Sequence, residues 1–227
     1  MVYEPGVTPH SLPYDPFKSC VIPRPIGWIS TVDGRGRHNL APFSQFQNVT
    51  FDPPIVMFSA NQGTAGSRKD SVRNAEETGE FVWNMATYAL REAVNKSAEE
   101  LPHGVDEFEY AGLKKLASRK VKPARVAGSP IHFECVYLNT LRFPGEPPMG
   151  TADVVFGRVV AIHIDDAVIG ADGRVDVMKI QPIARMGYYD YTVVDNRFEM
   201  VIGGGNEALR AGMEGSAEKA LAAKKGG

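Results

Sequence analysis

The sequence predicts a mainly β fold with interspersed helices, arranged as an antiparallel barrel rather than a doubly wound sheet. Several short apolar runs alternate with turn residues, and only short stretches between them have helical periodicity. Glycine and proline are frequent, at 23 and 16 of 227 residues, which is more than a helical protein usually carries. No G-x-G-x-x-G sequence follows a strand, so a Rossmann dinucleotide site is not supported.

The first part of the chain is predicted to form an extended arm and then a hairpin. Four prolines in residues 1–20 disfavour a helix and indicate an N-terminal extended arm. Two strand-like runs, 22–32 and 38–43, flank a glycine-containing turn, which is typical of a β-hairpin. A Pro-Pro pair then precedes a short apolar run at 55–60, which is of the buried-strand type.

Helices are predicted on both sides of the next strand. Asp70 or Ser71 can cap a short helix that runs to Glu77, and a glycine two residues later would end it. A strand is expected over 81–85. Thr87 can cap a second helix, whose apolar residues share one face.

Two longer strands are predicted in the second half, over 131–137 and 153–164. The second strand is apolar on both faces, which indicates that both faces are covered. A loop rich in glycine and proline, 143–150, separates the two strands. The main domain is expected to span residues 21–201, and a low-complexity tail rich in alanine, lysine and glutamate is expected over 202–227.

Composition argues against several classes of protein. The formal net charge of -2 and the pI of about 6.2 do not suit a nucleic-acid binder, which normally carries a basic face. No membrane span is expected, because no run approaches the required length, and the first residues lack the features of a signal peptide. A cytoplasmic protein is therefore predicted. Cys20 and Cys135 form no C-x-x-C pair and are expected to be reduced thiols rather than disulfide partners or zinc ligands.

The common catalytic motifs are absent from the sequence. There is no G-x-S-x-G, and the five histidines show no H-x-x-x-H spacing. Residues 63–69 resemble a phosphate loop in composition but lack the spacing of a Walker A motif. No catalytic side chain and no metal site are therefore predicted. If the protein is an enzyme, a bound cofactor is expected to supply the reactive group.

Three segments carry residues suited to hold such a cofactor. Residues 24–31 combine a proline, a glycine, an indole and two hydroxyls. Residues 39–48 offer small residues, aromatic rings and amides that could line the edge of a planar ring. Residues 67–71 place two cations and two hydroxyls where the chain enters a helix, which favours a phosphate. Taken singly, the first two segments could equally be plain barrel strands, and the third a solvated helix cap.

The order and spacing of these segments resemble those of the flavin reductase-like family. The resemblance covers roughly residues 16–191 and implies an FMN-binding split β-barrel of antiparallel Greek-key topology. It also implies a homodimer with one FMN per subunit near the dimer interface. The matching motifs are R-P-I-G-W-I-S-T (24–31), N-L-A-P-F-S (39–44), D-P-P-I-V-M-F (52–58) and K-D-S (69–71) with Asn74, followed by matches at 78–84, 104–109, 129–135 and 185–191.

The resemblance implies hydride transfer from NAD(P)H to flavin. Reductase components of two-component monooxygenases, such as the nitrilotriacetate type, belong to this family, so a partner monooxygenase would receive the reduced flavin. One alternative is a non-catalytic FMN-binding electron carrier that passes electrons to a protein partner. The sequence leaves this alternative open, because it contains no clear motif for nicotinamide recognition. A flavin-free barrel that serves as an interaction scaffold is a third interpretation.

The resemblance also indicates which residues would hold the cofactor. Lys69 and Ser71 are expected at the FMN phosphate, and Arg185 near the flavin ring. Gln45 and Tyr188 depart from the family, which often has an aromatic residue and a glycine there, and both changes could reshape the nicotinamide or substrate side. The full set expected to bind the cofactor is Arg24, Trp28, Ser30, Thr31, Asn39, Leu40, Ala41, Pro42, Phe43, Ser44, Asn48, Ser59, Asn61, Lys69, Asp70, Ser71 and Arg185.

Overall fold

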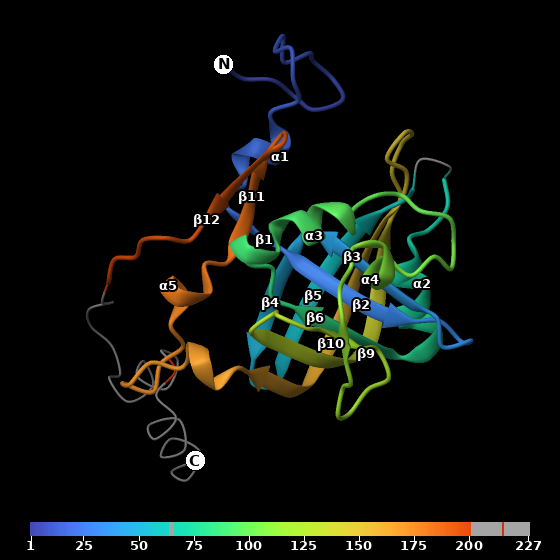
Figure 1. Ribbon diagram of the computed structural model, residues 1–227. Coiled ribbons are helices and arrows are strands. Elements are labelled where there is room, and N and C mark those ends of the chain that lie inside the picture. The colour runs from blue at the N-terminus through green and yellow to red at the C-terminus, as the bar shows by residue number, and fades with distance from the viewer. Residues whose placement is uncertain (64–65, 201–214, 216–227) are drawn as a thin grey trace, which may run out of the picture. The chain divides into compact units, whose positions relative to one another are not determined.

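The computed structural model describes residues 1–63, 66–200 and 215, in two units, 1–195 and 196–227. Within the described residues, every helix and strand belongs to the first unit. Seven described strands form one antiparallel sheet, in the order β3-β2-β6-β9-β10-β5-β4, which curls into a barrel (Figure 1). These strands are β2 (Gly27–Val32), β3 (His38–Phe43), β4 (Phe46–Phe51), β5 (Pro54–Asn61), β6 (Glu80–Asn84), β9 (Ile131–Phe143) and β10 (Ala152–Ile164).

Two smaller sheets and several short helices complete the fold. The described part of the chain adds a three-stranded sheet, in the order β1-β11-β12, and the pair β7-β8. Their strands are β1 (Arg24–Pro25), β7 (Lys115–Leu116), β8 (Arg125–Val126), β11 (Ile183–Gly187) and β12 (Asp190–Val193). The helices are α1 (Phe17–Cys20), α2 (Asp70–Thr78), α3 (Arg91–Lys96), α4 (Glu107–Tyr110) and α5 (Val177–Ile180), with 3-10 turns η1 (Tyr88–Leu90) and η2 (Asp166–Val168).

The strand order explains where the barrel is split. β3 and β4 follow one another in the chain yet form opposite edges of the sheet, so residues 44–45 join the two edges. The Ser59 N–H of β5 donates to the Gln45 carbonyl (2.8 Å), and the rings of Phe43 and Phe58 lie 5.1 Å apart. Among the described strands, β3 is hydrogen-bonded to β2 alone. β3 therefore packs near β5 without forming a ladder with it.

Two apolar clusters hold the barrel together. The cluster inside the barrel contains Ile29, Phe58 and Phe81, which are fully buried. The second cluster lies on the other face of β2 and β3, where α3 and α4 pack, and contains Trp28 and Phe108 (Figure 1). Both faces of β2 are therefore covered. This is why all six of its residues are buried, in place of the alternation typical of a half-exposed strand.

Most of the predicted strands and the first predicted helix are confirmed. The β2–β3 hairpin and strands β5, β6, β9 and β10 lie where the apolar runs indicated. α2 ends at Gly79, which adopts the left-handed conformation (φ 74°) and donates its N–H to the Ala75 carbonyl. The predicted cap is wrong, because the N-cap residue is Lys69 and no side chain caps this end.

Other details of the fold differ from the prediction. The predicted strand 22–32 is two strands, because β1 pairs with β11 whereas β2 pairs with β3 and β6. The predicted extended arm contains the helix α1. β4 was not predicted, because most of its side chains are exposed and its apolar residues do not alternate regularly with polar ones. β9 continues to Phe143, since pairing with β10 extends it beyond its apolar stretch.

Two further expectations concern the ends of the chain and its environment. The tail predicted over 202–227 lies outside the described residues, apart from Gly215. None of the helices described is long and apolar enough to cross a membrane.

Candidate functional site

Three residues of the predicted cofactor set form a buried polar network between β2, β3 and α2. The Asn39 Oδ1 atom accepts hydrogen bonds from the hydroxyls of Ser71 (2.7 Å) and Thr31 (3.2 Å). The Asn74 side-chain amide donates to the Thr31 hydroxyl oxygen (3.1 Å). All four residues are at least nine-tenths buried. The network therefore ties the first turn of α2 to the two strands behind it.

Glu107 at the start of α4 completes this network. One of its carboxylate oxygens accepts from the Asn39 side-chain amide (3.0 Å) and from the Leu40 backbone N–H (2.9 Å). Burial raises the pKa of this carboxyl, and the nearby negative charge of Asp70 acts in the same direction. Glu107 lies in a matching motif, 104–109, but its residue type gave no local signal of this role.

Trp28 and Ser30 also direct their polar atoms into the protein. The Trp28 indole N–H donates to the Ser97 hydroxyl (2.9 Å), and the Ser30 hydroxyl donates to the Ala124 carbonyl (2.5 Å). Both residues are fully buried, and Leu40 lies in the same apolar cluster as Trp28. These contacts fix α3 and the segment before β8 against the back of β2.

The free edge of β3 presents backbone carbonyls to the split. The Leu40 N–H bonds to Glu107, so the polar backbone atoms of Leu40 point away from β2. By the alternation of an antiparallel pair, those of Pro42 point the same way. Pro42 lacks an N–H, which suits a position on an unpaired edge. Ala41, between them, is half-buried, whereas Phe43 packs into the barrel core.

Polar side chains of β4, β5 and the connection before them face away from the barrel core. Alternate residues of β5 are buried, which leaves Ser59 and Asn61 on the outer face, half-exposed. Ser44 is half-buried and Asn48 is exposed. In the described part of the chain, the side chains of these four residues form no hydrogen bond. They are therefore available to a ligand.

The start of α2 lies near the end of β5. The Gly63 N–H donates to the Ser67 carbonyl (2.8 Å), which closes the connection between the two elements. The backbone N–H groups of Asp70 and Ser71 have no acceptor among the described residues, as expected in the first turn of a helix. The Asp70 carboxylate is paired with the side chain of His103 (2.9 Å).

The two cations at this helix start differ in their pairing. Arg68 donates two hydrogen bonds to Glu76 (2.7 and 2.8 Å) and one to Asp153 (2.9 Å), and the bonds to Glu76 raise its pKa most. The pair of Lys69 with Glu100 is long, at 3.4 Å, and both side chains are more than a third exposed. Such exposed pairs contribute on the order of 0–1 kcal/mol. Lys69 is therefore the cation that an anion can engage more readily.

Arg24 and Arg185 lie in the small sheet rather than in the barrel. They are direct partners in the β1–β11 pairing. The sequence-predicted set thus divides among three places: the covered back of β2 and β3, the split beside β5 and α2, and the β1–β11 pair.

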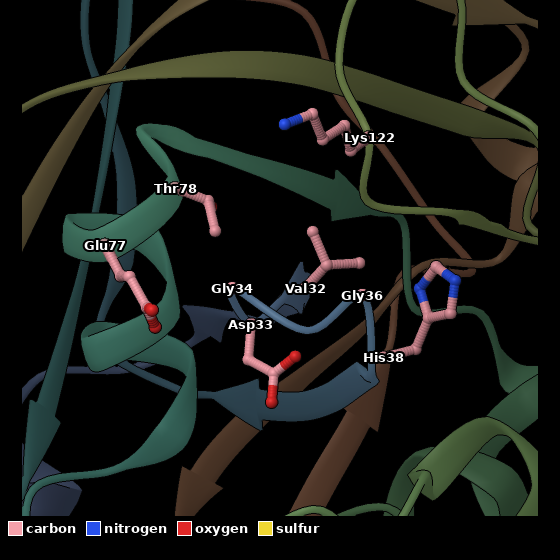
Figure 2. A pocket seen from close by; sticks show the side chains of 8 residues that line it. All are labelled: Val32, Asp33, Gly34, Gly36, His38, Glu77, Thr78 and Lys122. Atoms are coloured by element: carbon pink, nitrogen blue, oxygen red, sulfur yellow. The ribbon is translucent and has the colours of Figure 1, made fainter.

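A cavity of about 540 Å³ opens at the turn between β2 and β3, away from the predicted residues. Figure 2 shows Glu77 and Thr78 of α2 on one side of it and Lys122 on another. None of the predicted cofactor residues lines it. Among the described residues, no group of three His, Cys, Asp or Glu side chains is placed to hold a metal ion.

Comparisons with known proteins cover most of the chain. The family described as "Flavin reductase like domain" matches residues 19–190. An uncharacterized protein of Aquifex aeolicus is 37% identical over 171 residues, which are 74% of this chain and 84% of that protein.

Two solved structures extend the comparison. Nitrilotriacetate monooxygenase component B from Bacillus cereus is 30% identical with a TM-score of 0.80, and the match covers 88% of this chain and 98% of that one. A protein with a split barrel domain from Shewanella frigidimarina is 19% identical with a TM-score of 0.69, covering 79% of this chain and 86% of that one. The predicted mainly β split-barrel fold and the predicted resemblance are confirmed.

Proposed function

The chain belongs to the flavin reductase-like family, and on this premise we propose that it is an FMN-binding oxidoreductase that transfers a hydride from NAD(P)H to flavin. The observation that carries the proposal is the split between β3 and β5. There the unpaired edge of β3 and the outward-facing polar side chains of β5 border the split, and the first turn of α2 is hydrogen-bonded to β3 through Ser71 and Asn39.

The phosphate of FMN fits the start of α2. The free N–H groups of Asp70 and Ser71 and the Lys69 ammonium are the donors that a phosphate takes at a helix N-terminus. Asn61, at the end of β5, would add an amide. The Ser71 hydroxyl already donates to Asn39, so Ser71 would contribute through its backbone.

The planar ring fits the edge of β3 and the outer face of β5. A flavin ring carries both donors and acceptors at its edge, and the carbonyls of Leu40 and Pro42 with the hydroxyls of Ser44 and Ser59 can satisfy both. Trp28, Ser30, Thr31 and Asn39 would support this edge from behind, since each is buried and hydrogen-bonded within the protein. Contact of Asn48 with FMN is part of the proposal, whereas Arg24 and Arg185, which pair in the separate small sheet, are not assigned to FMN.

The site needs no acid or base from the chain. Bound flavin would supply the electron-accepting ring, to which a nicotinamide transfers a hydride. The protein's part is then to orient the ring and to exclude competing reactions. Ser44, in the short 44–45 connection, and Ser59, within β5, suit that part, because donors fixed on a sheet stabilise developing charge without reorganisation.

We also propose the homodimer that the family resemblance implies. Large apolar side chains are exposed on β4 and β9, a pattern that marks an interaction surface. A second copy of the chain would cover them, and size-exclusion chromatography with light scattering should give twice the chain mass. The exposed side chains are Val49, Phe51, Leu138, Leu141 and Phe143.

A partner monooxygenase and a cytoplasmic location are also proposed, on the basis of the family resemblance.

The test is the visible spectrum of the purified protein, before and after NADH or NADPH is added, with and without free FMN. Oxidation of the nicotinamide that depends on FMN is the expected result. Bound flavin that neither nucleotide reduces would contradict the reductase and favour the electron carrier. Protein that is colourless and binds no FMN in a fluorescence titration would refute both.

A further inference from the structure

Two arginines face each other across the small sheet. Arg24 of β1 is the direct partner of Arg185 of β11, and α1 packs against β11 beside them (Figure 1). Like charges placed directly opposite one another destabilise a strand pair. Burial lowers the pKa of Arg24, and the charge of Arg185 lowers it further. This pair therefore opposes the stability of its own sheet unless another group compensates it.

Among the described residues, neither arginine forms an ion pair. Arg24 donates to the backbone carbonyls of Lys18 and Val21, the latter at 3.1 Å. Arg185 donates to the Tyr188 carbonyl and the Tyr191 hydroxyl and lies over the ring of Tyr191. All of these partners are neutral. By contrast, Arg68, Arg37 and Arg142 are each paired with a carboxylate at 2.6 to 2.7 Å.

Two buried donors at this place have no partner among the residues that the structure describes. Arg24 is 9% exposed, and its Nε atom is buried without a hydrogen bond. The Ser19 hydroxyl of α1 is likewise buried and unpaired. Ser19 contacts Gly187, two residues after Arg185, where a Cβ atom would collide with it. An unsatisfied buried donor is unfavourable and calls for an explanation.

We propose that Arg24, Arg185 and the Ser19 hydroxyl bind an anionic oxygen group, a phosphate or a carboxylate, of the second substrate that exchanges electrons with the flavin. One anion would satisfy both orphan donors and offset both charges. The identity of the molecule rests on the proposed function, whereas the anion site does not.

The second site is distinct from the one proposed for the FMN phosphate. α2 packs on β2, β3, β6 and β9, whereas Arg24 and Arg185 belong to the sheet of β1, β11 and β12. FMN carries one phosphate, which cannot occupy both places. The second cationic site is therefore left for a different molecule, either a nicotinamide nucleotide, through its phosphates, or an acidic acceptor, through its carboxylate.

The experiment compares Arg185→Gln with Arg174→Gln, a control that removes an arginine with an 83% exposed side chain. Inorganic pyrophosphate, NADPH and benzoate are titrated by calorimetry into each protein loaded with FMN. For each of these probes that binds the natural protein at this site, Arg185→Gln should raise the dissociation constant about tenfold, the usual scale for one charge-assisted contact. Binding of FMN should change less than about twofold, and Arg174→Gln should behave as the natural protein. Because Arg24 holds α1, it is left intact, and Arg185→Lys should recover part of the loss.

The three probes separate the two sources of the anion. Loss of pyrophosphate and NADPH binding together assigns the site to the electron donor, and loss of benzoate binding assigns it to an acidic acceptor. Absence of anion binding in the natural protein would overturn the proposal. So would an equal loss of FMN affinity in Arg185→Gln, which would place the pair in the flavin site. If the protein binds no FMN, the proposed function fails, and the pyrophosphate titration of the flavin-free protein still decides the anion site.

Discussion

Replacing Glu107 with alanine should destabilise the protein, because two buried donors would lose their acceptor. The Asn39 side-chain amide and the Leu40 N–H both bond to one Glu107 oxygen, at 3.0 and 2.9 Å. An unsatisfied buried donor costs about 1–3 kcal/mol, so the pair predicts a loss of roughly 2–6 kcal/mol in the free energy of unfolding. Relief of the buried charge of Glu107 opposes this loss and favours the lower half of the range.

Glu107→Gln separates the hydrogen bonds from the charge. The glutamine side chain keeps an oxygen that can accept both bonds, so its stability at neutral pH should lie within about 1 kcal/mol of the natural protein. The folded-state pKa of Glu107 is raised above its ordinary value of 4.5, so the unfolded chain ionises first. The natural protein therefore loses stability as the pH rises from about 4.5 through the folded-state pKa, and Glu107→Gln should lack that loss.

The assay is equilibrium unfolding in urea, followed by the fluorescence of the two buried tryptophans, Trp28 and Trp83. Glu109→Ala in the same helix is the matched control, because its side chain is 79% exposed and its pair with Lys115 is long, at 3.5 Å. The control should change stability by less than about 0.5 kcal/mol. A loss below about 1 kcal/mol in Glu107→Ala would show that the network is not what holds α4 to β3.

Three other variants or treatments test separate parts of the structure. Lys69→Ala should weaken FMN binding by about 1–3 kcal/mol and leave riboflavin binding unchanged, because only FMN carries the phosphate; equal losses for both ligands in a fluorescence titration would contradict this. Cys20 is exposed and Cys135 is buried with a strongly raised pKa, so a thiol reagent should modify one cysteine in the native protein and the second only after unfolding. Burial lowers the pKa of His132 from 6.5 to about 4, so stability should fall as the pH drops from 6.5 towards 4, and His132→Gln should flatten that limb in urea titrations; an unchanged limb would exclude His132 as its source.

Local signals in the sequence were enough to predict most of the fold. Apolar runs in the sequence predicted most strands of the barrel. The end of α2 at Gly79 was predicted because glycine adopts positive φ without strain. The break between β1 and β2 has no local signal. It depends on Arg24 pairing with Arg185, far along the chain. β4 escaped prediction because only Phe46 among its residues is buried, so its sequence shows no regular apolar face, and because its place is set by pairing with β5.

The side of a strand that faces a ligand could not be predicted in the same way. Trp28 and Ser30 carry the groups that a flavin site needs, yet both direct them to a second apolar cluster built by residues much later in the chain. The hydroxyl of Ser97 and the carbonyl of Ala124 decide that direction. Residue type therefore indicated the chemistry of the predicted cofactor site. Which of the predicted residues have side chains free to contact a ligand depends on tertiary contacts.

The start of α2 is held from two sides, and this bears on how tightly it can bind an anion. On one side Ser71 and Asn74 bond to β3 and β2, and on the other Arg68 bonds to Asp153 on β10. A site whose donors are already fixed spends little free energy on ordering when a ligand arrives. Lys69 lies between these two attachments with only a weak exposed pair. An anion at Lys69 therefore meets backbone N–H groups in place, and its affinity should depend on charge rather than on rearrangement of the helix.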